Sequence, residues 1–342
     1  MTTGKQNKPE GINTEPPPSD SPPPPPEQLP ERLLKCDAVL SLTGEREIFN
    51  SLQQASWKAA HSVYYEDQKE KKWRETDIIA RRSWARQRKS GTQYCTINLT
   101  IECKSVKDYN IIFAPETLDN HYSAVQAYWF PGEGRLQKLA SNLETTELNS
   151  KQTSLFIRNL EELAFPNGRS LLMDFETPHP KAPLASTAFK ETNIKVDKDL
   201  DASVLWRANQ SLRSAIDSFR KTQFENDYSS LQDIMQTARR TSNSVHDSAM
   251  AFANKLSHEI NVFHPIIVIE SRLWKLHETH LDEIPWCRHV HIDRTGVADW
   301  WVDVVGRSHF EKYSAQLTKH YELQMSKTGA RQLKAPRKPM FY

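Results

Sequence analysis

The segment CTINLTIECK, residues 95–104, alternates between apolar and polar side chains at every step. Successive side chains of a β-strand point to opposite faces of a sheet, so this pattern predicts a strand with one face in a hydrophobic core. The apolar face holds Cys95, Ile97, Leu99, Ile101 and Cys103, and the polar face holds Thr96, Asn98, Thr100, Glu102 and Lys104. Glu102 and Lys104 therefore project together at the C-terminal end of the strand.

Helix and strand patterns surround this segment. A helix is expected over LTGEREIFNSLQQASW, with Thr43 as its N-cap and Ile48 and Leu52 on one face. Further strands are expected at HSVYYE (61–66), WRETDIIARR (73–82) and YNIIFAP (109–115), with a charged turn at DQKEKK and a basic loop at RSWARQRKSG. One helix followed by strands in hairpin-like succession indicates an α+β fold.

The helical period returns after residue 200. A single stripe is formed by Val204, Leu205, Ala208, Leu212, Ala215, Ile216 and Phe219, and a second helical run spans 228–256. Strands are then expected at HPIIVIE, RLWKLHE, CRHVHID and DWWVDVVG, before an amphipathic helix over SHFEKYSAQLTKHYELQMSK. Because helices separate two sets of strands, we expect one mixed sheet with helices on its faces. Loop signals dominate 115–200, which we interpret as an insertion or cover with one helix at 154–163.

Both ends of the chain differ from its middle. Residues 1–31 hold ten of the twenty prolines, a composition typical of a disordered, extended tail that serves as a spacer or binds a proline-recognising partner. Residues 328–342 form a basic C-terminal tail. The folded domain is expected over 32–327, a length sufficient for a sizeable core.

Composition excludes several classes of protein. A formal charge of +2 is too small for a chain that coats nucleic acid or anionic lipid over its whole surface. The four cysteines are widely spaced, which argues against a zinc knuckle or disulfide framework and favours a reducing, cytoplasmic setting. No apolar run of about 18 residues is present, so we expect no membrane span.

Other catalytic motifs are missing from the sequence. It contains no G-x-S-x-G elbow, P-loop or G-x-G-x-x-G pattern, which leaves no warrant for a serine hydrolase, an NTPase or a dinucleotide-binding enzyme. HETHLDE and SHEINVFH miss the H-E-x-x-H spacing of a helical zinc site. His289 and His291 share a strand face, yet no third ligand accompanies them.

An acidic and basic group of residues remains. Among three E-x-K or D-x-K matches, only Glu102 and Lys104 end an apolar strand, whereas the other two lie in the charged run EDQKEKK. If the strands of Asp77 and Glu102 pair in a hairpin, Asp77 lies close to both residues. Converging carboxylates are typical of a Mg²⁺ site, while the simpler interpretation is an exposed salt bridge between Asp77 and Lys104.

The order of these residues resembles the PD-(D/E)xK nuclease superfamily, which has the restriction-endonuclease-like fold. The resemblance covers residues 42–114: a helical acid (Glu45), a strand Asp77, and the motif Glu102-x-Lys104. It departs from the common pattern at Thr76, where proline is frequent, and Glu47 is an alternative helical acid. The resemblance implies a Mg²⁺- or Mn²⁺-dependent endonuclease in which Glu45, Asp77 and Glu102 hold metal, while Lys104 serves the attacking water. An inactive binding or scaffold protein of the same fold is the alternative.

The expected basic loop is a candidate nucleic-acid contact. It carries five cations around one tryptophan: Arg81, Arg82, Trp84, Arg86, Arg88 and Lys89. Cations next to a metal site suit phosphate binding, and a tryptophan suits base stacking; a solvated hairpin tip is the alternative. The expected partners are DNA, RNA as a second possibility, and a second copy of the chain, since many such nucleases pair to cut two strands.

Overall fold

The computed structural model describes residues 29–88, 91–106, 109–115, 185–193, 203–241, 247–248, 251, 259–292, 298–327 and 331–333. The chain divides into two compact units, Met1–Leu40 and Ser41–Tyr342. In the first, helix α1 covers Leu29–Leu34. The second holds the sheet and the residues predicted to form the site.

Eleven strands within the described residues form one mixed sheet in the order β1-β2-β3-β6-β10-β9-β5-β4-β7-β8, and β11 pairs with β2. Their bounds are β1 Lys58–Glu66, β2 Trp73–Arg88, β3 Gly91–Lys104, β4 Tyr109–Pro115, β5 Ala185–Asn193, β6 Glu259–Ile269, β7 Arg272–Leu276, β8 Leu281–Ile284, β9 Trp286–Ile292, β10 Ala298–Gly306 and β11 Arg331–Gln332. β1, β2 and β3 are antiparallel neighbours, whereas β3, β6 and β10 run parallel.

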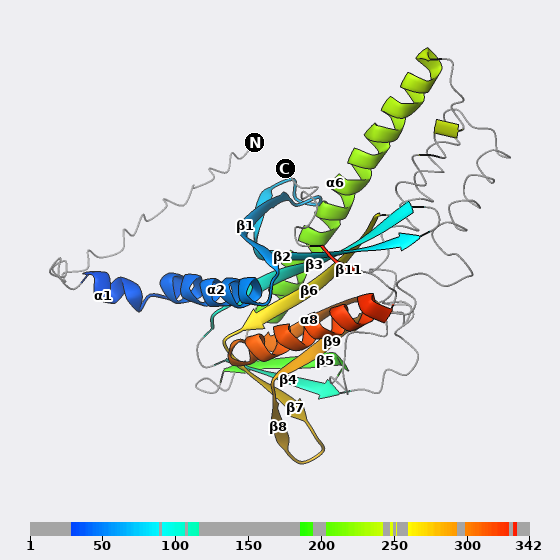
Figure 1. Cartoon of the computed structure of the whole chain (residues 1–342). Helices are drawn as coiled ribbons and strands as arrows, with labels where there is room; N and C mark the ends of the chain where they lie inside the picture. Colours follow the sequence, from blue (N-terminus) through cyan, green and yellow to red (C-terminus); the bar gives the residue numbers. More distant parts are fainter. Residues whose placement is uncertain are drawn as a thin grey trace, which may run out of the picture. The chain divides into compact units, whose positions relative to one another are not determined.

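Helices cover both faces of this sheet (Figure 1). α2 (Asp37–Gln54) and α8 (Phe310–Lys327, preceded by the 3₁₀ turn Arg307–His309) pack with one set of strand residues, and α6 (Val204–Arg240) packs with another. Alternate residues of β6 join different clusters: Val262 and Ile266 face α2 and α8, while Phe263 and Ile267 face α6. The predicted mixed sheet flanked by helices is therefore confirmed, as is the apolar stripe on α6.

A left-handed residue closes α2. Ser56 has φ 63°, the backbone N–H of Ser56 donates to the carbonyl of Gln53 at 2.9 Å, and that of Trp57 donates to the carbonyl of Leu52 at 2.9 Å. This pair of bonds is the Schellman motif, in which glycine usually takes the position of Ser56. The turn directs Trp57 into the core, where its indole N–H donates to the Thr318 hydroxyl of α8 at 2.7 Å.

A fully buried ion pair joins strands β9 and β10 in the middle of the sheet. The Arg288 guanidinium donates to both carboxylate oxygens of Asp303, at 2.7 and 2.9 Å. His264 of β6 and Tyr313 of α8 also bond to Asp303, at 2.8 and 2.6 Å. Burial alone would raise the pKa of Asp303, but Arg288 and His264 outweigh it and hold that pKa well below its ordinary value. The network ties three strands and helix α8 together and lies in the core.

Several local predictions are wrong. α2 begins at Asp37, six residues before the predicted cap Thr43. The expected basic loop is strand, because β2 continues to Arg88 and β3 starts at Gly91. β4 does not follow β3 in the sheet but pairs with β5 and β7.

Two segments expected outside the sheet contribute strands to it. β5 lies within the expected insertion, and Arg331–Gln332 of the expected C-terminal tail pairs with Trp84 and Ala85 of β2. The expected helix at 154–163 lies outside the described residues, and so does the proline-rich segment 1–28.

Candidate active site

The carboxyl ends of three parallel strands meet at one edge of the sheet. β3 ends at Lys104, β6 at Ile269 and β10 at Gly306. The backbone N–H of Glu270 donates to the carbonyl of Lys104 at 3.0 Å, which aligns the first two strand ends. Open sheets with parallel strands commonly bind ligands at this edge, so Glu102 and Lys104 occupy a favourable place.

Asp77, Glu102 and Lys104 lie together across the β2–β3 pair. Ile78 pairs with Ile101 in the antiparallel register, which brings Asp77 beside the end of β3. The Lys104 ammonium lies 2.7 Å from Oε2 of Glu102 and 3.7 Å from Oδ2 of Asp77. The same Asp77 oxygen accepts a hydrogen bond of 2.6 Å from the backbone N–H of Cys103. One ammonium therefore sits between two carboxylates from neighbouring strands.

Glu102 is held from the opposite side by α6. Its Oε1 accepts a hydrogen bond of 2.9 Å from the Ser211 hydroxyl, while the Tyr65 hydroxyl donates to the Ser211 carbonyl at 3.1 Å. The Glu102 residue is only 3% exposed. The polar face predicted for β3 is thus covered by a helix, with Thr100 and Asn98 also buried beneath it.

Glu45 reaches this group from α2. Its carboxylate accepts a hydrogen bond from the Ser41 hydroxyl at 3.1 Å, one helical turn earlier. Burial, followed by repulsion from Asp77, raises the pKa of Glu45, against the opposing effects of Ser41 and Lys104. The alternative acid, Glu47, instead accepts a bond of 2.8 Å from Arg307. The charge of Glu45 is thus coupled to those of Asp77 and Lys104.

Burial shapes the charges of the strand residues as well. It raises the pKa of Glu102, and Asp77 adds to that effect, while Lys104 and Ser211 oppose it. Burial alone would lower the pKa of Lys104, but the carboxylates of Glu102 and Asp77 outweigh it, and the net pKa is raised. Lys104 is therefore an ammonium ion at neutral pH. Its single positive charge does not offset the effect of burial on Glu102, whose pKa stays raised.

The donor set fits a hard divalent cation in its chemistry. Glu45, Asp77 and Glu102 supply carboxylate oxygens, the ligands that Mg²⁺ and Mn²⁺ prefer. Burial, with a smaller contribution from repulsion by Asp77, raises the pKa values of Glu45 and Glu102, and a bound cation would offset both effects. The three carboxylates do not, however, bring three oxygens within 4.8 Å of one another; in the described part of the chain only His277, His280 and Asp282 form such a group. Lys104 and Ser211 occupy the two oxygens of Glu102 instead.

The residues predicted to contact nucleic acid do not form a basic loop. Trp84 is 2% exposed in the core, which leaves no ring face for a base, and the Arg82 guanidinium is buried against Glu322, Gln332 and the Ala55 carbonyl. Arg81 lies half-buried on β2. Arg86 and Arg88 belong to the same strand, although their side chains, like the whole of Lys89, lie outside the described residues.

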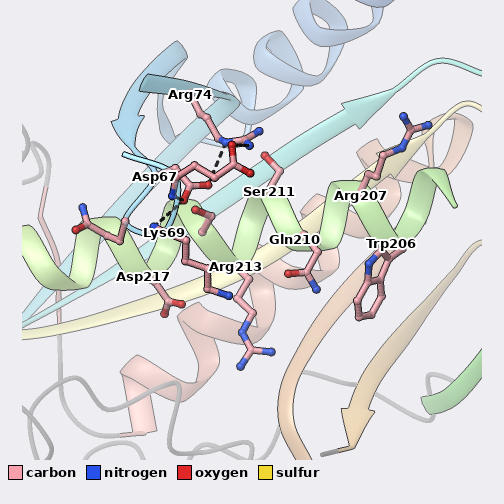
Figure 2. Close-up of a pocket in the computed structure, with 12 residues that line it drawn as sticks. Asp67, Lys69, Arg74, Trp206, Arg207, Gln210, Ser211, Arg213 and Asp217 are labelled. Atoms are coloured by element: carbon pink, nitrogen blue, oxygen red, sulfur yellow. Dashed lines mark hydrogen bonds and ion pairs between the residues drawn. The ribbon is translucent and has the colours of Figure 1, made fainter. Parts of the chain in front are cut away.

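A groove lies next to Ser211, between the β1–β2 turn and the first half of α6. It has a volume of about 510 Å³. Figure 2 shows Trp206 and Arg207 near the start of α6, and Asp67, Lys69 and Arg74 at the other end. Arg74 pairs with Asp67 at 3.0 Å and with Glu70 at 2.9 Å. Apart from Trp206, the residues that line the groove are polar or charged, with both signs of charge, and they include Ser211, which holds Glu102.

Comparison of the chain with protein-family models, curated proteins and solved structures found no match. The nuclease resemblance therefore depends on the residues themselves. Among the helices that the structure describes, none combines the length and apolar character needed to cross a membrane.

Sequence reasoning missed two residues beside this site. Ser211 lies on α6, 109 positions from Glu102 along the chain, and only its polar character on an otherwise apolar helix stripe hints at a role. Arg307 begins the turn after β10 and contacts Glu47 at 2.8 Å and Glu270 at 3.4 Å. Its place at the same edge as Lys104 depends on the parallel pairing of β3, β6 and β10, which local patterns do not reveal.

Proposed function

We propose that this protein is a Mg²⁺- or Mn²⁺-dependent endonuclease that hydrolyses phosphodiester bonds in DNA. The observation that carries the proposal is the position of the Lys104 ammonium, 2.7 Å from Glu102 and 3.7 Å from Asp77, with Glu45 electrostatically coupled to the same group. A lone surface salt bridge would need neither a buried carboxylate nor a third acid from a helix. The order of these residues also resembles the PD-(D/E)xK superfamily.

Each residue has a separate role in the proposal. Asp77 and Glu102 are the main metal ligands, and Glu45 completes the set from α2. Ser211 orients Glu102 through its hydrogen bond to Oε1. Because its pKa is raised, Lys104 acts as a donor: it positions the attacking water and stabilises negative charge on the phosphate, rather than removing a proton. Mg²⁺ held by these carboxylates would supply the Lewis acidity that makes a water acidic and neutralises the phosphodiester.

The substrate strand is proposed to lie along the groove beside Ser211. Trp206 is 43% exposed there, and Arg207 and Lys69 supply charges that suit a phosphate backbone. An exposed tryptophan stacks on bases without sequence preference. In the proposal this groove replaces the expected basic loop as the nucleic-acid contact. Of the residues predicted for that loop, Arg81 is described and half-buried, whereas Arg82 and Trp84 are buried.

The alternative is a binding or scaffold protein in which the site does not hold a metal. The observation in its favour is that Lys104 and Ser211 already satisfy the two oxygens of Glu102, and that the three carboxylates are not gathered within 4.8 Å. The proposed setting is cytoplasmic, which agrees with four free thiols. RNA as a substrate and pairing of two copies stay predictions.

The direct experiment is cleavage of plasmid and of single-stranded DNA with Mg²⁺, with Mn²⁺ or with EDTA. Lys104→Ala is expected to lower the rate at least about 100-fold, the usual loss when one group that stabilises transition-state charge is removed. Lys312→Ala, an exposed lysine of α8, is the matched control and is expected to cleave normally. Equal rates for wild type and Lys104→Ala would contradict the mechanism. DNA binding without cleavage by wild type would favour the alternative.

A further inference from the structure

Two histidines and an aspartate meet at the tip of the β7–β8 hairpin. The loop between the strands carries His277 and His280, and Asp282 is the second residue of β8. The backbone N–H of His277 donates to the carbonyl of His280 at 2.9 Å, which closes the turn. β8 ends the sheet order opposite β1 and β2, so this group is separate from Asp77 and Glu102.

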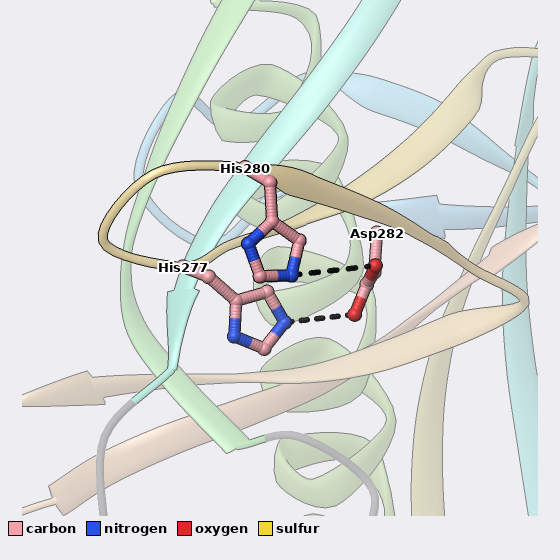
Figure 3. A group of neighbouring side chains, drawn as sticks. All are labelled: His277, His280 and Asp282. Atoms are coloured by element: carbon pink, nitrogen blue, oxygen red, sulfur yellow. Dashed lines mark hydrogen bonds and ion pairs between the residues drawn. The ribbon is translucent and has the colours of Figure 1, made fainter.

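The side chains already converge. Nε2 of His277 lies 2.9 Å from one carboxylate oxygen of Asp282, and Nε2 of His280 lies 3.8 Å from the other. The two imidazole rings are parallel, with centroids 4.4 Å apart and an interplanar angle of 3°. Figure 3 shows both rings turned so that one nitrogen of each faces Asp282. One ligand atom from each residue lies within 4.8 Å of the other two.

We propose that His277, His280 and Asp282 bind a divalent transition metal ion of the zinc class. Zinc bonds to nitrogen of about 2.0–2.1 Å at tetrahedral angles place neighbouring ligand atoms roughly 3.3 Å apart. The separations of 2.9 and 3.8 Å lie on either side of that value. The ligands are half-buried or exposed, so small rotations of surface side chains complete the geometry without disturbing the core.

The ligand types select the metal. Two imidazoles and one carboxylate suit Zn²⁺, Ni²⁺ or Cu²⁺, whereas Mg²⁺ and Ca²⁺ prefer oxygen ligands alone. Three protein ligands leave a fourth position for water. Lys275 pairs with Asp282 in the β7–β8 register. Its positive charge repels the metal ion, so we expect an affinity in the micromolar range. The metal would join the loop to β8 and hold the hairpin at the edge of the sheet.

The test is calorimetric titration of the full chain, purified without metal, with Zn²⁺. Wild type is expected to show a micromolar site that His280→Ala and Asp282→Asn each weaken at least tenfold. Glu283→Gln, the neighbouring exposed acid of β8, is the matched control and is expected to bind as wild type does. Circular dichroism of each metal-free variant checks that the fold is kept. We expect it to be kept because the substituted side chains are exposed.

A spectroscopic measurement makes the result independent of other zinc-binding groups in the chain. Co²⁺ in place of Zn²⁺ is expected to give visible absorption of a four- or five-coordinate site that is lost in the double variant His277→Ala/His280→Ala. Identical titrations and identical Co²⁺ spectra for wild type and the double variant would overturn the proposal. Loss of the tight site in Glu283→Gln to the same degree as in Asp282→Asn would also overturn it.

Discussion

The Lys104 ammonium donates a hydrogen bond of 2.7 Å to Glu102, two residues earlier on the same strand. Residues at this spacing share a face of the sheet, and here that face is covered by α6. Burial raises the pKa of Glu102, and Lys104 opposes only part of that effect, whereas Glu102 and Asp77 together raise the pKa of Lys104. In the proposed function, a metal ion replaces part of this contact.

The pH dependence of cleavage follows from these shifts. Because the pKa of Lys104 lies above the ordinary 10.5, its charge is constant from pH 7 to 9, so we expect no rise in kcat from lysine deprotonation in that range. Because the pKa values of Glu45 and Glu102 lie above the ordinary 4.5, we expect the rate to fall on acidification before pH 4.5 is reached. Initial rates at saturating Mg²⁺ measure both limbs. A tenfold rise in rate per pH unit above 7 would show that a base titrates there.

Ser211 is predicted to act through Glu102. Ser211→Ala removes the donor to Oε1, and outer contacts of this kind typically change metal affinity or activity by about 10–100-fold. We expect a higher Mg²⁺ concentration for half-maximal rate and a lower kcat, with KM for DNA little changed. Ser230→Ala, an exposed serine farther along α6, is the control. An unchanged Mg²⁺ dependence in Ser211→Ala would argue that the bond only supports the fold.

Glu45→Gln is predicted to stabilise the metal-free protein at neutral pH. A carboxyl whose pKa is raised in the folded state binds its proton more tightly there than in the unfolded chain. Its ionisation at pH 7 therefore lowers the free energy of unfolding, and this loss is absent below the unfolded pKa of 4.5, where the group is protonated in both states. Glutamine removes this cost and keeps an oxygen to accept from Ser41. Urea unfolding in EDTA should show the gain at pH 7 and its disappearance at pH 4. Glu47→Gln, which weakens the contact with Arg307, should show no gain.

Ser56→Gly tests the end of α2. A left-handed backbone costs an ordinary residue about 1–2 kcal/mol, and glycine in the unfolded chain costs roughly 0.5–1 kcal/mol, so we expect a net gain near 0.5 kcal/mol. Ser51→Gly, within the same helix, should instead lose about 0.5 kcal/mol, the difference in helix propensity between serine and glycine. Urea unfolding of both variants gives the two signs. A loss of stability in Ser56→Gly would mean that the serine side chain stabilises the turn.

Trp206→Ala tests the groove. Removing one base stack typically weakens single-strand binding by about 1–3 kcal/mol, and the exposure of Trp206 predicts little change in folding stability. Fluorescence anisotropy with a labelled oligonucleotide measures the affinity. Trp73→Ala is the control because Trp73 is 75% exposed and lies outside the groove. Equal weakening in both variants would place the nucleic acid elsewhere.

Local patterns predicted much of the candidate site. The strict alternation of residues 95–104 placed Glu102 and Lys104 on one face, and antiparallel succession brought Asp77 beside them. The seven-residue stripe of α6 followed from the helical period, and most of it is buried. These features depend on neighbours along the chain, which is why one sequence suffices to predict them.

Features that depend on distant neighbours were missed. The polar face of β3 and the charged end of β2 pack under α6 and α8, so Arg82 and Trp84 are buried in a segment whose charges suggested a loop. The positions of Ser211 and Arg307 and the strand order depend on the parallel pairing of β6 with both β3 and β10. His277, His280 and Asp282 meet through a turn, and their spacing matches no helical metal motif.

In the proposed function, Asp77 and Glu102 share one divalent cation. The most direct measurement is anomalous diffraction from crystals of the full chain grown or soaked with millimolar Mn²⁺. We predict a peak about 2.0–2.3 Å from oxygens of both Asp77 and Glu102, with Lys104 displaced from its present contact with Glu102. Absence of a peak there, with Glu102 still held by Lys104 and Ser211, would contradict the account.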